Sequence, residues 1–209
     1  MRVGRSAGRS LLDVGTGSGR NLPLALQRGY AVCALDPSAS ALSEVKVRFP
    51  EVRTMPSDLE GCDLAPGSVD VVQDFSVLHC SPPERQERHV ARVHELLAPG
   101  GHWLLACWAS DPAPGWFSLV VDGALPEWGV APSTLRELVK GRFHLLDAVV
   151  LADSEPLPLA HYLLRKGEGP ERGWPDDPPH DGSFTDDHGR WRFVPGYAYP
   201  ILERYLGGR

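Results

Sequence analysis

The sequence predicts an α/β protein with a Rossmann-like, doubly wound, mainly parallel seven-stranded sheet and a terminal antiparallel strand. Three observations predict this fold class. Apolar strand-like segments alternate with helix-like segments, a loop of alternating glycines follows the first strand, and the last two apolar segments are close enough to form a hairpin. Strand–helix–strand alternation favours parallel strands joined by right-handed crossovers.

Each expected strand is a short apolar run. Residues 10–14 form a buried strand before the glycines, and residues 102–108 are apolar almost throughout, which is typical of a strand covered on both faces. The expected strands are Ser10–Val14, Tyr30–Leu35, Val52–Met55, Val69–Gln73, His102–Trp108, Phe143–Leu151 and Pro158–Arg165.

Helices are expected between these strands. The segment Pro82–Leu97 has apolar residues at helical spacing and is ended by Pro99–Gly101. Ser133 is expected to cap the last helix. The expected helices are Asn21–Arg28, Ala39–Arg48, Pro82–Leu97 and Ser133–Lys140.

Composition divides the chain into three parts. Residues 1–166 suit one core, residues 167–182 are rich in Pro, Gly and charge and indicate an exposed linker, and residues 183–209 regain apolar content. Residues 111–132 are typical of a lid or loop. Trp116, Phe117 and Trp128 there line a substrate wall or pack as a satellite core.

The charge and hydropathy of the chain limit the classes of partner that we expect it to bind. A net charge of −6 and a pI near 5.7 argue against nucleic acid, because phosphate binding needs a surplus of Lys and Arg. No apolar run is long enough to cross a bilayer, and residues 1–10 lack the apolar stretch of a secretory signal. We therefore expect a cytoplasmic protein that acts on a small molecule, with no membrane partner; the oligomeric state is not predicted.

Cysteines and histidines do not predict a metal site. Four cysteines lie too far apart for a CxxC site and are too few for a disulfide framework, so reduced, structural roles are expected for Cys33, Cys62, Cys80 and Cys107. His180 and His188 lie near pairs of aspartates, but their spacing fits no ligand pattern, so a solvated loop is expected.

The segment LLDVGTGSGR at residues 11–20 carries the chemistry. Gly15, Gly17 and Gly19 let the backbone turn sharply and approach a ligand without Cβ atoms. The helix N-terminus that follows favours an anionic group such as a carboxylate. Asp13, at the end of the strand, is placed to accept hydrogen bonds from a ligand ammonium.

Two nucleotide ligands fit this loop unequally. The next strand ends at Asp36, about 20 residues beyond the loop, where an acidic residue accepts both hydroxyls of a ribose. A dinucleotide such as NAD requires the spacing GxGxxG, but position 20 is Arg. Because Asp13 suits an amino-acid-bearing cofactor, S-adenosylmethionine (SAM) is preferred, and NAD is the alternative.

Residues 10–110 resemble the class I SAM-dependent methyltransferases. The resemblance rests on the glycine segment, on residues 57–70 as the third motif, on residues 71–79 as the fourth, and on the helix-to-strand turn at 96–101. It implies methyl transfer from SAM, with S-adenosylhomocysteine as product. The segment Gly19–Asn21 is most similar to tellurite- and thiopurine-methyltransferase-like members.

The resemblance also implies roles for single residues. The residue at the end of the first strand and the glycines would hold the methionine part of SAM, and the acid ending the second strand would bind the ribose. Pro37 would pack on the adenine, Asp58 would accept from its amino group, and Leu59 would line its pocket. The implied cofactor-binding residues are Asp13, Gly15, Gly17, Gly19, Asp36, Pro37, Asp58, Leu59 and Phe75.

His79 is the candidate general base. It follows the fourth strand and should lie at the carboxyl edge of the sheet, where ligands bind in such folds. Its alternative roles are to shape the pocket or to pack. Cys80, beside it, has no activating partner evident from the sequence, so packing is expected.

Both ends of the chain depart from the family pattern. Helices usually precede the first strand, which here begins at residue 10, and residues 186–206 resemble that missing segment. One hypothesis is a circular permutation that docks the C-terminal helix beside the first strand; the other is an unrelated C-terminal extension. Three functions are considered: SAM-dependent methyl transfer to a small molecule, NAD-dependent oxidoreduction, and SAM binding without catalysis.

Overall fold

Seven strands, four α-helices and one 3₁₀ turn form the part of the chain that the computed structural model describes, residues 9–109, 128–151, 159–170 and 173–176. In chain order they are β1 (Ser10–Val14), α1 (Leu22–Gln27), β2 (Ala31–Leu35), α2 (Ala39–Arg48), β3 (Arg53–Met55), β4 (Val69–Phe75), η1 (Leu78–Cys80), α3 (Pro83–Leu96), β5 (Leu97–Trp108), α4 (Pro132–Val139), β6 (Phe143–Leu151) and β7 (Leu159–Lys166).

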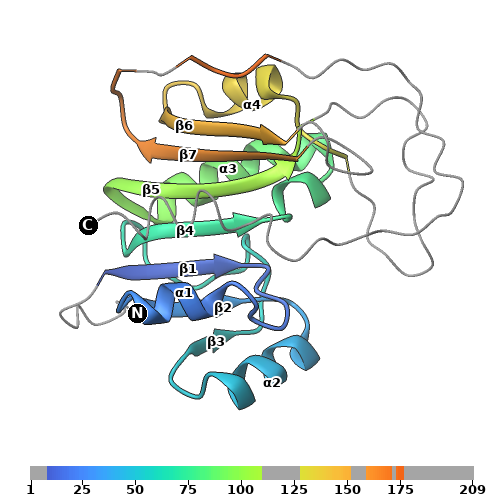
Figure 1. Cartoon of the computed structure of the whole chain (residues 1–209), viewed down its shortest axis with the longest axis vertical. Helices are drawn as coiled ribbons and strands as arrows, with labels where there is room; N and C mark the ends of the chain where they lie inside the picture. The colour runs from blue at the N-terminus through green and yellow to red at the C-terminus, as the bar shows by residue number, and fades with distance from the viewer. Residues whose placement is uncertain (1–8, 110–127, 152–158, 171–172, 177–209) are drawn as a thin grey trace, which may run out of the picture.

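The strands form one sheet in the order β3-β2-β1-β4-β5-β7-β6 (Figure 1). The four pairings from β3 to β5 are parallel, whereas β7 is antiparallel to both β5 and β6. The predicted fold class is confirmed, as is the predicted hairpin of the last two strands. Strand β7, the antiparallel strand, lies between β5 and β6, so the edge strand on this side of the sheet is β6.

Helices cover both faces of the sheet. On one face, α3 and α4 contribute residues such as Val90, Val93 and Leu135 to a large core cluster. On the other face, Leu22 and Ala25 of α1 and Val45 of α2 pack against the apolar residues of β1, β2, β4 and β5. Such doubly wound sheets bind ligands at the carboxyl ends of their parallel strands, which sets where the functional site should lie.

Two predicted helix boundaries are corrected. Helix α4 begins at Pro132, one residue before the predicted cap Ser133, because the fixed φ of proline suits the first helical position. Helix α3 ends at Leu96, and the predicted stop Pro99–Gly101 belongs to β5. There β5 bulges between Leu97, which pairs with Val69, and His102, which pairs with Val71.

Several other expectations have mixed outcomes. The four cysteines are free thiols, three of them buried. Trp174, in the predicted linker, packs against the core beside Tyr162. Within the described ranges, no helix has the length and apolar content needed to span a membrane. Trp116, Phe117, His180, His188 and the segment 183–209 lie outside the described residues, so the permutation hypothesis stays a prediction.

Candidate cofactor site at the carboxyl edge

The glycine loop joins β1 to α1 at the carboxyl edge of the sheet. All three of its glycines have positive φ, +65° at Gly15, +52° at Gly17 and +77° at Gly19, which L side chains adopt only with strain. A Cβ on Gly15 would overlap Val77 Cγ2, and one on Gly19 would crowd Leu22 Cδ1 at 2.9 Å. A Cβ on Gly17 would meet no atom of the described residues within 4 Å, so the middle of the loop has a side that these residues leave open.

Asp36 connects this loop to the end of β2. Its Oδ2 accepts a hydrogen bond from Gly17 N at 2.9 Å, and its Oδ1 accepts one from Ser38 N at 2.8 Å. Asp36 as a whole is 9% exposed. Because each carboxylate oxygen offers two acceptor directions, both keep capacity for a ligand hydroxyl. The structure therefore brings together the predicted loop and the predicted ribose acceptor.

Asp13 lies directly before the loop and is 2% exposed. Its Oδ1 accepts from Gln73 Nε2 at 2.6 Å, while its Oδ2 has no hydrogen-bond partner among the described residues. Burial raises the pKa of this carboxyl group to about 6, opposed by the hydroxyl of Thr16 and the amide of Gln73. The Thr16 hydroxyl favours the charged form without making a hydrogen bond of acceptable geometry.

We expect Asp13→Asn to stabilise the free protein near neutral pH. The folded state holds the Asp13 proton more tightly than the unfolded chain does. The free energy of unfolding therefore falls as pH rises from 3.8 to about 6, and above that pH the loss stays constant. Two pKa units correspond to about 3 kcal/mol. The gain should be about 3 kcal/mol at pH 7.5 and about 1 kcal/mol at pH 4.5, measured by urea unfolding. Equal gains at both pH values would contradict the assigned pKa.

The segment after β4 brings the predicted base to the same edge. His79, in η1, is fully buried, and its Nδ1 accepts a hydrogen bond from Trp108 N at 3.2 Å. Its carbonyl oxygen accepts from Trp128 N at 2.7 Å. An imidazole that accepts at Nδ1 is neutral and carries its proton on Nε2. In this arrangement His79 is a donor at Nε2, so acting as a base would require it to release the Trp108 bond or change tautomer.

Two features of this segment escaped the sequence analysis. Ser76 has φ +69° and is the one non-glycine residue with positive φ in the described part of the chain; such strain concentrates at functional sites. Asp74 and His89 form a buried pair, with Oδ2 to Nε2 at 2.6 Å, and Asp74 Oδ1 accepts from Leu78 N at 3.3 Å. The pair therefore holds η1. Neither feature has a sequence signal, since both depend on long-range packing.

The predicted adenine contacts are more dispersed. Pro37 is exposed beside Asp36, and Asp58 is exposed with its Oδ1 accepting from Gly61 N at 2.7 Å. Leu59 is 5% exposed and belongs to the core cluster on the α3 side. Phe75, at the end of β4, packs in the opposite cluster. The structure leaves their predicted roles as predictions.

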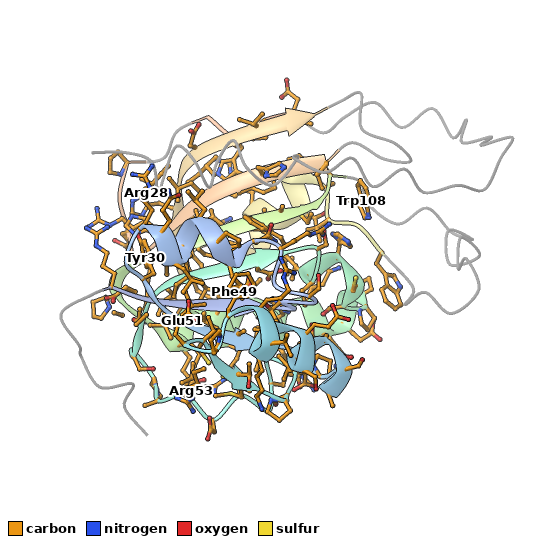
Figure 2. All side chains as sticks on the ribbon, turned by 60° about the horizontal axis from the view of Figure 1, so that its bottom comes forward. Arg28, Tyr30, Phe49, Glu51, Arg53 and Trp108 are labelled. Carbon is orange, nitrogen blue, oxygen red and sulfur yellow. The ribbon has the colours of Figure 1, made fainter. Side chains whose placement is uncertain are left out.

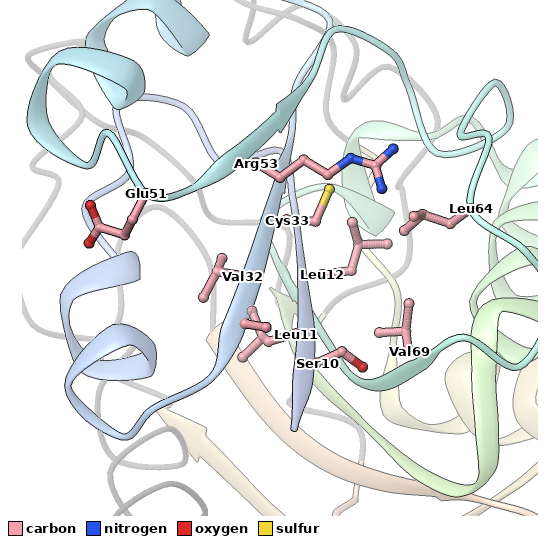
Figure 3. Close-up of a pocket in the computed structure, with 10 residues that line it drawn as sticks. Ser10, Leu11, Leu12, Val32, Cys33, Glu51, Arg53, Leu64 and Val69 are labelled. Atoms are coloured by element: carbon pink, nitrogen blue, oxygen red, sulfur yellow. The ribbon is translucent and has the colours of Figure 1, made fainter. Parts of the chain in front are cut away.

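A separate cavity of about 170 Å³ lies at the other edge of the sheet (Figure 3). It is bordered by the first residues of β1 and β2, including Leu11, Val32 and Cys33, with Glu51 and Arg53 at its rim. Figure 2 likewise separates Arg28 and Tyr30, at this end, from Trp108 at the carboxyl edge. The cavity contains none of the predicted site residues, so it is not the predicted cofactor site.

About half of the chain is similar in sequence to known methyltransferases. Residues 11–101 match a family model described as a methyltransferase domain. An uncharacterized methyltransferase of Synechocystis sp. is 30% identical over 100 residues, 48% of this chain and 47% of that protein. One of Mycobacterium bovis is 32% identical over 111 residues, 53% of this chain and 44% of that protein. The matches thus span about half the length of these curated relatives.

A solved structure shares the fold. It is the Burkholderia thailandensis 1,6-didemethyltoxoflavin-N1-methyltransferase, which contains 1,6-didemethyltoxoflavin and S-adenosylhomocysteine. The TM-score is 0.64 at 23% identity, over 77% of this chain and 72% of that chain. The family match covers residues 11–101, and the strand order is that of a Rossmann-like sheet. Residues 11–101 of this chain are thus similar in sequence to a methyltransferase domain, and the fold is shared with a solved methyltransferase.

The residues at the carboxyl edge fit SAM, the cofactor that the sequence predicts. Gly17 leaves an open side on the loop, and Asp36 keeps acceptor capacity for a ribose beside it. Asp13 Oδ2 and Gln73 Oε1 are buried acceptors with no donor among the described residues. Buried acceptors are rarely left unpaired, so these two suit a polar, donor-bearing ligand.

Proposed function

We propose that the protein transfers the methyl group of SAM to a small-molecule acceptor. The observation that carries this proposal is the hydrogen bond from Gly17 N to Asp36 Oδ2, which joins the glycine loop to a ribose acceptor on the neighbouring strand. Bound SAM supplies an electrophilic methyl group on a sulfonium whose leaving group is neutral. The chain's own task is therefore mainly to position the two reactants.

On this proposal, each predicted residue has one task. The loop and Asp13 hold the amino-acid part of the cofactor, and Asp36 orients the ribose through both of its oxygens. Pro37, Asp58 and Leu59 form the adenine side, with the first two exposed and the third in the core. Phe75, 7% exposed at the end of β4, supplies an apolar wall between cofactor and acceptor.

The acceptor is proposed to be small. The net charge of −6 disfavours a nucleic acid, and the fold neighbour from B. thailandensis holds 1,6-didemethyltoxoflavin in its structure. The likeness of Gly19–Asn21 to tellurite- and thiopurine-methyltransferase-like members supports the same size of acceptor. In the structure, Arg20 of this segment is exposed and Asn21 is buried before α1.

Two measurements test the function. Calorimetric titration with SAM and with NAD should give binding to SAM alone. Transfer of a labelled methyl group from SAM should then be followed against a panel of phenols, thiols, heterocyclic amines and carboxylic acids, with RNA and unfolded protein as macromolecular acceptors. Binding of NAD in place of SAM would overturn the cofactor assignment. SAM binding without transfer to any acceptor would favour a binding protein, and transfer to RNA alone would refute a small acceptor.

His79→Ala tests the proposed general base. A base contributes about 10²- to 10⁴-fold to such reactions, so turnover should fall by that factor while the Kd for SAM changes less than about twofold. The matched variant His79→Asn offers a side-chain oxygen to Trp108 N but cannot act as a base. If the Asn variant keeps full turnover, His79 only positions the segment between Trp108 and Trp128.

A further inference from the structure

Gln73 is an unusual residue for its place in the sheet. It lies on the central strand β4 with no exposed surface, between Val71 and Phe75 on the same face, and Leu104 is its partner on β5. A buried amide at such a position is unfavourable unless its polar atoms are used. Its Nε2 donates to Asp13 Oδ1, in register on β1, but its Oε1 has no partner among the described residues.

The orientation of the Gln73 amide follows from chemistry. The ionised carboxylate of Asp13 accepts hydrogen bonds and cannot donate one, so the NH₂ group of Gln73 must face it. The carbonyl oxygen of Gln73 then faces away from Asp13 Oδ1. As a result, two groups joined by a 2.6 Å hydrogen bond each have one further oxygen that accepts no hydrogen bond from the described residues, Asp13 Oδ2 and Gln73 Oε1. The Thr16 hydroxyl also acts on Asp13, where it favours the charged form.

The charges around this pair are negative. Asp74 and Asp36 both act on Asp13 to disfavour its ionised form, and no cation acts on it from the described residues. Two unpaired acceptors in a negative, buried environment suit a cationic donor with several N–H groups. A primary ammonium has three, enough to reach both oxygens and still donate elsewhere.

We propose that Gln73 Oε1 and Asp13 Oδ2 together bind the α-ammonium of the adenosyl amino acid. Gln73 is then the positioning residue that selects ligands with a free amino group. This inference rests on the proposed function, because it assumes that the cofactor binds at the glycine loop. It differs from a purely structural role, in which Gln73 only satisfies Asp13 within the sheet and every adenosyl ligand depends on it equally.

The test compares two ligands that differ only in the amino group. Calorimetry at pH 7.5 gives the Kd of S-adenosylhomocysteine and of its analogue with hydrogen in place of the α-amino group. Gln73→Met should raise the Kd of S-adenosylhomocysteine roughly tenfold, as expected for the loss of one charged hydrogen bond. The Kd of the deaminated analogue should rise less than about twofold. The matched control is Gln86→Met, which removes another buried glutamine amide, one that donates to Ser81 O and Gly129 O and not to Asp13.

A second measurement uses the unaltered protein and so does not depend on the variant's folding. An ammonium on Asp13 favours its charged form, so binding at pH 6 should release up to about half a proton per S-adenosylhomocysteine bound. Titrations in buffers of different ionisation enthalpy measure this release, which should vanish with the deaminated analogue.

The outcomes separate the two proposals. No binding of S-adenosylhomocysteine to the unaltered protein would refute the proposed function itself. Binding with equal losses for both ligands in Gln73→Met, or with no proton release at pH 6, would overturn the role of Gln73 and leave the function standing.

Discussion

Gly15→Ala should destabilise the protein by about 3 kcal/mol and abolish binding of SAM. A left-handed φ of +65° costs an L residue about 1–2 kcal/mol, and the new Cβ overlaps Val77 Cγ2 in a packed position, which costs a further 1–3 kcal/mol. Relief of that overlap would separate the loop from the segment after β4, where the cofactor and acceptor should meet. Urea unfolding and calorimetric titration with SAM measure the two effects.

Gly17→Ala is the matched control. Its φ is also positive, at +52°, but its Cβ would meet nothing within 4 Å in the part of the chain that the structure describes. The substitution should therefore cost only about 1 kcal/mol of stability. It should still weaken the binding of SAM, because the added methyl group enters the open side of the loop. The double variant Gly15→Ala/Val77→Ala should regain the part of the lost stability that comes from the overlap with the Val77 side chain. Equal stability losses for the two glycine variants would show that Gly15 and Val77 do not press together in solution.

The sequence was sufficient to predict that the glycine loop and Asp36 lie close together at the carboxyl edge. The glycine loop and Asp36 follow neighbouring parallel strands, and parallel neighbours end at one edge, so their contact needs only the correct strand order. The parallel sheet and the final hairpin follow from the alternation of elements and from the short connection at residues 152–158. The exact turn after α3 did not follow, because Leu97 pairs with Val69, which sequence spacing does not reveal.

Contacts between distant strands could not be predicted. Asp13 and Gln73 are 60 residues apart, and their hydrogen bond depends on the register of β1 against β4. Register follows from packing over the whole sheet, so a glutamine in an apolar strand gives no sign of its partner. The tautomer of His79 likewise depends on where Trp108 N lies. The signal available in the sequence was only that an otherwise apolar strand carries polar residues, Gln73 and Asp74 among them.

His89→Ala should be among the most destabilising single changes, by about 3–5 kcal/mol. His89 Nε2 lies 2.6 Å from Asp74 Oδ2, the carboxyl group has no exposed surface, and the imidazole also stacks on Trp103. Removing one member of a buried pair leaves the other without compensation, which is the dominant cost. Because Asp74 Oδ1 also accepts from Leu78 N, the turn that carries His79 should shift, and turnover should fall as well.

The sign of the coupling identifies the cause. If an uncompensated Asp74 carboxylate is responsible, Asp74→Asn/His89→Ala should be more stable than His89→Ala alone, although it carries one more substitution. Asp74→Asn by itself should cost only about 1 kcal/mol, since a neutral amide can still hydrogen-bond to the imidazole. Urea unfolding of the four proteins at pH 7.5 gives the coupling energy directly. A double variant less stable than His89→Ala would mean that lost packing against Trp103, and not a stranded charge, accounts for the effect.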